Sequence, residues 1–158
     1  MATLRGWQVV AVGGQNTVIP EGYLEYRISI SCSTTAPGAA VGTDLVISGA
    51  SSSSIFGVQQ GSAGTIQPLS VAGSSGVVAR LGYPENQVQN ISAQVSLSRY
   101  VVGGTYFGGL VHSSGTGSAF HITSKTEFGA SPLGQIRIAR GASSITNVRF
   151  IIEAFVEP

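Results

Sequence analysis

The chain of 158 residues carries a formal net charge of +1, and only 9% of its residues are charged. Its length favours one domain, over residues 1–158, with a substantial buried core. The eight basic residues are scattered along the chain, which excludes the local basic arm by which many proteins neutralise nucleic-acid phosphates. No apolar run approaches the roughly 20 residues of a transmembrane helix. We therefore expect neither direct nucleic-acid binding nor a transmembrane segment.

Short segments of alternating apolar and polar residues follow one another along the chain, whereas a helical period is missing. The clearest segment is 24–32, in which every second residue from Leu24 to Cys32 is apolar. Turns rich in Gly, Ser and Pro separate the segments, and the Ser/Gly-rich stretch 48–64 is expected to be a long loop. In chain order the expected strands are 7–12, 24–32, 45–48, 66–71, 77–81, 93–102, 106–111, 120–123, 135–139 and 147–156.

Many short strands separated by such turns indicate two packed sheets or a barrel. We predict an all-β fold, an antiparallel jelly-roll-like sandwich or barrel of about 8–10 short strands. The last segment, 147–156, is apolar at alternate positions from Val148 to Val156, and Ile151 and Phe155 make its second face half apolar. A strand of this kind is expected to be covered on both sides.

A catalytic or metal site has few residues to draw on. His112, His121 and Asp44 could join a serine in a triad, but no serine lies in a Gly-x-Ser-x-Gly turn. His121 is expected to point away from the core, because it alternates with apolar neighbours. A structural zinc site needs four Cys or His ligands, and the chain has three such residues. We predict no enzymatic activity, no metal and no cofactor.

Cys32 is the only cysteine, so an internal disulfide is excluded. It closes the apolar face of segment 24–32, where a buried thiol acts as a small hydrophobic side chain. We favour this interpretation over a role as a nucleophile.

A weakly charged surface rich in Gly and Ser is poorly protected against association. Segments 55–58 and 106–111 are apolar and contain no charged residue, and an exposed strand of this composition would invite pairing with another chain. We predict that subunit contacts come from these segments and from the second face of the last strand, through Ile55, Phe56, Tyr106, Phe107, Ile151 and Phe155. The alternative, that all three segments lie inside one sandwich, stays open.

The number of strands and the spacing of the turns resemble those of single jelly-roll viral capsid proteins. In character, the chain is most similar to the small capsid proteins of membrane-containing icosahedral phages. The resemblance implies a structural protein located in the virion, a capsid building block whose partners are copies of itself and other virion proteins. The chain differs from the coat proteins of plant RNA viruses, because those proteins carry a basic N-terminal arm.

The alternative function is a trimeric receptor- or glycan-binding head of a phage fibre, similar to jelly rolls of the tumour-necrosis-factor type. Sugar sites on β-sandwiches use exposed aromatic side chains, for which Tyr83 is a candidate.

Overall fold

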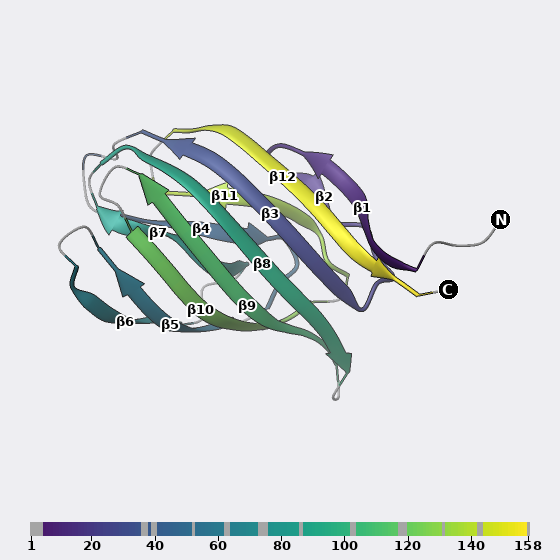
Figure 1. Ribbon diagram of the computed structural model, residues 1–158. Helices are drawn as coiled ribbons and strands as arrows, with labels where there is room; N and C mark the ends of the chain where they lie inside the picture. Colours follow the sequence, from purple (N-terminus) through teal and green to yellow (C-terminus); the bar gives the residue numbers. More distant parts are fainter. Residues whose placement is uncertain are drawn as a thin grey trace.

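The computed structural model describes residues 5–35, 38, 41–51, 53–61, 64–72, 76–85, 87–101, 104–116, 120–130, 132–141 and 144–157. Within these ranges every regular element is a β-strand, and the strands form two antiparallel sheets packed as a sandwich (Figure 1). The predicted all-β, jelly-roll-like fold is confirmed.

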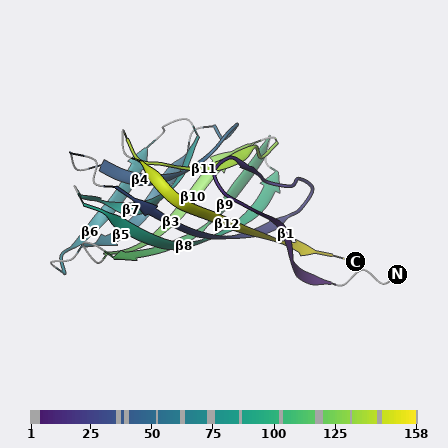
Figure 2. The same cartoon turned by 90° about the horizontal axis from the view of Figure 1, so that it is seen from above.

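The described strands are, in chain order, β1 (Gly6–Gly13), β2 (Thr17–Val18), β3 (Glu25–Thr34), β4 (Val41–Ile47), β5 (Ser54–Gln60), β6 (Ile66–Ala72), β7 (Val77–Glu85), β8 (Gln89–Val101), β9 (Thr105–Thr116), β10 (Phe120–Gly129), β11 (Gln135–Ala139) and β12 (Ile145–Val156). The larger sheet has the order β1-β12-β3-β8-β9-β10-β5-β6, and the smaller has the order β2-β11-β4-β7. Figure 2 shows the smaller sheet lying over one face of the larger.

The strand pairs are nested along the chain, as they are when one long hairpin is rolled up. Strand β1 pairs with β12, β2 with β11, β3 with β8 and β4 with β7, all antiparallel. The roll closes because β12 also pairs with β3 and β11 with β4. These eight strands therefore make a complete jelly roll of two four-stranded sheets.

The remaining four strands are two insertions that widen one sheet. Strands β5 and β6 lie between β4 and β7 in the sequence, and β9 and β10 lie between β8 and β11. Strand β9 pairs with β8, and β10 pairs with β5, so both insertions add to the same edge of the jelly roll. The larger sheet is thereby widened to eight strands, with β1 at one edge and β6 at the other.

The core lies between the two sheets and follows from the alternation of each strand. In β8, the inward side chains from Ile91 to Leu97 are buried, while the polar residues between them are exposed. In β12, Phe150, Ile152 and Ala154 face the core and are fully buried. The second face of β12 is only partly covered, so the prediction that both of its faces are buried is correct for one face.

One buried cation joins the two sheets. Arg140 follows β11 of the smaller sheet, yet its guanidinium donates hydrogen bonds to Thr34 Oγ1 in β3 and, at 3.2 Å, to Gln89 Oε1 in β8. It also donates to the carbonyl oxygen of Gln87 at 3.0 Å. Burial lowers the pKa of Arg140. Several oxygen acceptors around the guanidinium offset part of the cost of removing its charge from water.

All ten segments predicted as strands lie on strands, with differences at the ends and two omissions. Strand β5 lies inside the expected loop 48–64, because Ile55 is buried and ladder pairs on both sides bind the backbone. The short strand β2 is the second omission. Leu24 is 56% exposed, since it precedes β3 rather than opening its buried face.

Two expected subunit-contact residues belong to the core. Ile55 and Phe107 are both buried, and Phe107 stacks on Phe128 with 5.8 Å between the ring centroids. Segment 106–111 is also not a free strand edge, because β9 pairs with β8 and with β10. Neither Ile55 nor Phe107 can therefore contact a partner while this fold is intact.

We expect Phe107→Ala to lower the free energy of unfolding by about 3–5 kcal/mol, because it opens a cavity against Phe128. Phe56→Ala is the matched control, since Phe56 lies in the outer face of the same sheet, and its effect is expected to stay within about 0.5 kcal/mol. Urea unfolding of dilute protein measures both. Equal effects of the two substitutions would contradict the assignment of Phe107 to the core.

Candidate functional site

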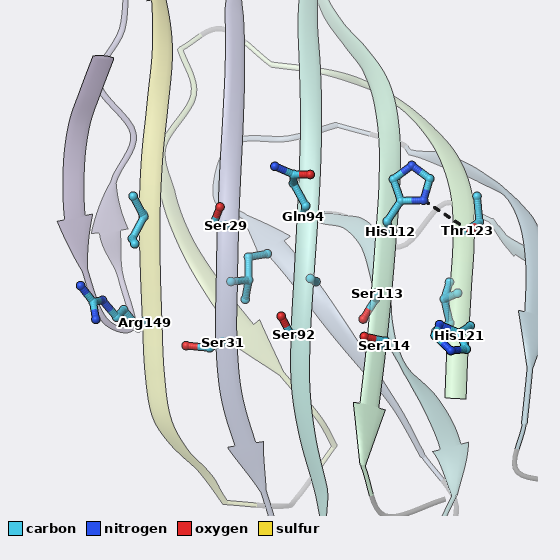
Figure 3. A pocket seen from close by; sticks show the side chains of 14 residues that line it. Ser29, Ser31, Ser92, Gln94, His112, Ser113, Ser114, His121, Thr123 and Arg149 are labelled. Atoms are coloured by element: carbon cyan, nitrogen blue, oxygen red, sulfur yellow. Dashed lines mark hydrogen bonds between the residues drawn. The ribbon is translucent and has the colours of Figure 1, made fainter. Parts of the chain in front are cut away.

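The outer face of the larger sheet carries an open groove of about 550 Å³ (Figure 3). Five neighbouring strands form its floor: β12, β3, β8, β9 and β10. The sheet is continuous there, so strand register decides which side chains meet.

Two cross-strand rows line the groove. The first row runs through Ile151, Ser29, Gln94, His112 and Thr123, each directly opposite the next. The second row runs through Arg149, Ser31, Ser92, Ser114 and His121 in the same way. Figure 3 shows both rows, with the serines of the second row between Arg149 on one side and His121 on the other.

The hollow comes from side-chain size. In the second row, three serines occupy consecutive strands, and the longer Arg149 and His121 stand at the two ends. Adjacent strands are about 4.8 Å apart, so four spacings separate these end residues by roughly 19 Å. The groove is therefore long, open to solvent and low in the middle.

Within the described part of the chain, the polar side chains of the groove make almost no hydrogen bonds or ion pairs. The imidazole Nδ1 of His112 lies 3.4 Å from Thr123 Oγ1. No hydrogen bond or ion pair to another described residue is made by the side chains of Ser29, Ser31, Ser92, Gln94, Ser114, His121 and Arg149. The neighbouring Ser113 points inward instead, donating to the carbonyl oxygen of Leu81.

A second feature of the same face is an exposed group of apolar side chains, which we call the apolar strip: Phe56, Val58, Ile66 and Pro68. Phe56 is 61% exposed, Val58 50% and Ile66 68%. Val58 lies opposite Pro68 in the β5–β6 ladder, and Ile66 is two residues away on the same face. The strip thus covers the β6 edge of the sheet.

An aromatic cluster lies toward the opposite edge. The ring of Trp7 in β1 meets Phe155 of β12 edge-on, with 5.6 Å between the centroids. The guanidinium of Arg27 covers the other part of the indole, 3.8 Å from its centroid, a distance at which cation–π attraction operates. Trp7 is therefore shielded from above and is not a free stacking platform.

The remaining predicted contact residues are spread over this face. Phe56 belongs to the apolar strip, Ile151 lines the groove and Phe155 packs against Trp7. Tyr106 is half-buried and stacks on Tyr100. The sequence pattern assigned these residues to subunit contacts but did not show where they lie relative to one another.

The residues considered for a catalytic triad are not brought together. Asp44 lies in β4 of the smaller sheet, paired with Arg80, whereas His112 and His121 lie on the outer face of the larger sheet. Burial raises the pKa of Asp44, and the Arg80 guanidinium beside it acts in the opposite direction. The described residues contain no group of three or more side chains suited to holding a metal ion.

What sequence reasoning missed is the groove itself. It assigned His121 to the surface, and both histidines are indeed exposed. The signal that could have indicated a site was the run of outward serines in 29–31 and 92–98, but nothing in the sequence aligned them with Arg149 and the histidines.

Comparisons with known protein families, curated proteins and solved structures found no match. Among the described residues, no helix is long and apolar enough to span a membrane.

Cys32 is buried at 4% exposure, and burial raises the pKa of its thiol from the ordinary 9.0 to about 11. Between these two values the unfolded chain holds fewer protons than the folded protein, so stability falls as the pH rises through this window. We expect Cys32 to contribute a loss of about 2–3 kcal/mol between pH 9 and pH 11. Denaturant unfolding of wild type and Cys32→Ala measures it as the difference between the two curves. Parallel curves would contradict it.

Proposed function

We propose that the protein is a structural subunit of a virus particle, a capsid building block that self-associates through the outer face of its larger sheet. The observation that carries this proposal is the apolar strip. The jelly-roll pairing and the low charge support it, because jelly rolls commonly serve as capsid subunits.

The apolar strip has the chemistry of a contact surface. Large apolar side chains scattered singly over a surface are ordinary, whereas a contiguous group marks an interaction site. Phe56 and Val58 lie on one face of β5, next to Pro68 and Ile66 of the neighbouring strand. Lys125 separates Phe56 from the exposed Leu110, so a charged side chain borders the strip on the groove side.

Strand β6 is the outermost strand, and its position favours association by its face over extension of the sheet. Its segment 66–72 contains no charged residue, which leaves its edge weakly protected. Pro68, however, has no backbone N–H and interrupts any ladder on that edge. A partner that packs on the strip avoids this interruption and buries Phe56 and Val58.

We expect the double substitution Phe56→Lys/Val58→Lys to weaken self-association at least tenfold, since burying two lysines costs more than the roughly 1.4 kcal/mol of one decade. Val18→Lys is the matched control: Val18 is 59% exposed, but it lies in the smaller sheet. Light scattering over a concentration series measures association, and thermal unfolding shows that each variant folds.

Particles seen by negative-stain imaging, from shells to capsomer-sized species, would support the capsid role if the double variant reduces them. A stable monomer at high concentration would contradict it. A discrete trimer that grows no further would overturn it in favour of the receptor- or glycan-binding head of a fibre.

A further inference from the structure

We propose that the groove on the larger sheet binds an acidic oligosaccharide, with the acidic group of the sugar at Arg149 and its hydroxyl groups along the serines. The proposal goes beyond self-association, because the groove and the apolar strip share no residue, although Val58 of the strip lies directly opposite Thr123 of the groove. It names a ligand class for a site that lies within one subunit.

The groove is lined by side chains that both donate and accept hydrogen bonds. A serine hydroxyl both donates and accepts, and so does the amide of a glutamine. Ser29, Ser31, Ser92 and Ser114 offer four such hydroxyls on adjacent strands, with Gln94 beside them. None of these side chains is engaged with another described residue. A chain of sugar hydroxyls matches this array, since each also donates and accepts.

The charged lining of the groove favours an anionic ligand. The ionisable side chains that line the groove are Arg149, His112 and His121, and no carboxylate is among them. The nearest row of the same face adds Lys125 on β10 and the facing pair Arg27 and Glu153. Arg149 is the fixed positive charge of the groove, and its planar guanidinium can donate two parallel hydrogen bonds to a carboxylate or a sulfate.

The shape of the groove favours an extended ligand. The groove is open and about 550 Å³ in volume, and it runs across five strands rather than closing around one small molecule. A ligand that reaches both Arg149 and His121 must span roughly 19 Å, four strand spacings. This requires an extended chain, so an oligosaccharide fits better than a single sugar.

Other polymers match less well. Single-stranded nucleic acid needs large aromatic platforms and several phosphate-binding cations, but no Phe, Tyr or Trp lines the groove and its one arginine is Arg149. A protein partner would be anchored by large apolar or aromatic residues at the centre of its contact, but serines occupy the centre here. The hydroxyl-rich middle and the cationic end fit an acidic sugar chain.

The test is isothermal titration calorimetry with three oligosaccharides of similar length. The carboxylated probe is a hyaluronan hexasaccharide, the sulfated probe is a κ-carrageenan hexasaccharide, which has no carboxylate, and the neutral probe is chitohexaose. The proposal expects saturable binding of a carboxylated or sulfated probe, and whichever of the two is preferred identifies the acidic group. Binding of chitohexaose as tight as that of the acidic probes would overturn the assignment to acidic sugars.

Two variants locate the site. Arg149→Gln removes the fixed charge and is expected to weaken binding at least tenfold. Ser92→Tyr fills the middle of the groove and is expected to abolish binding. The matched control is Arg137→Gln, which removes an exposed arginine from β11 in the smaller sheet and should bind like wild type. Thermal unfolding confirms that all three fold.

The result that overturns the proposal is an affinity unchanged by Arg149→Gln and Ser92→Tyr, or no binding of any probe at millimolar concentration. A neutral variant of the apolar strip, Phe56→Gln/Val58→Gln, is titrated in parallel, because lysines at these positions would add positive charge beside Thr123 of the groove. Its unchanged affinity would place binding in the groove, whereas its loss of binding together with association would assign the site to the contact between copies and refute a site within one subunit.

Discussion

Strand β10 pairs with β5 from His121 opposite Gln60 to Glu127 opposite Ser54, and this ladder is what joins the two insertions to each other. Gly57 shows how closely the strands approach, since a Cβ at this position would overlap the carbonyl oxygen of Thr123. Without this ladder, the contacts of β5 with β7 would be the main support of the apolar strip on the jelly roll. The histidine side of the groove would likewise lose the strand that covers its edge.

The outer face of the larger sheet therefore carries two different surfaces, the polar groove and the apolar strip. The original jelly-roll strands β12, β3 and β8 contribute Arg149 and most of the serines. The inserted strands contribute both histidines, and β5 and β6 contribute the whole apolar strip. A sheet confined to the four jelly-roll strands would have room for part of the groove and none of the strip.

Much of the fold could be predicted from alternation, because a strand buried on one face has apolar residues at every second position of its sequence. Residues 24–32 and 135–139 are examples. Strand β5 was missed because Ser54, Gly57 and the serines before them are typical of loops, and because β10, one of its two pairing partners, lies far away in the chain. Pairing of distant strands leaves no local signal, so the order of strands in each sheet could not be predicted.

The same limit applies to the candidate site, although one part of the error was avoidable. Ile55 and Phe56 are adjacent, as are Tyr106 and Phe107, so in a strand only one of each pair can face outward. Period alone thus excludes a contact made by both. Which member faces the core depends on register, and so does the meeting of Arg149 with the serines of three other strands.

The pairing of β1 with β12 also sets the order of events during synthesis. Gly6 faces Val156 in the finished sheet, so β1 waits for β12 while the residues between them are translated, which takes on the order of 10 s at ribosomal rates. During that interval the nascent chain exposes the backbone of β1 and, beside it, the unfilled place of β12 against β3. Crowded polysomes would bring such chains close together, and a chaperone that covers the first strands would keep them apart until the last strand emerges.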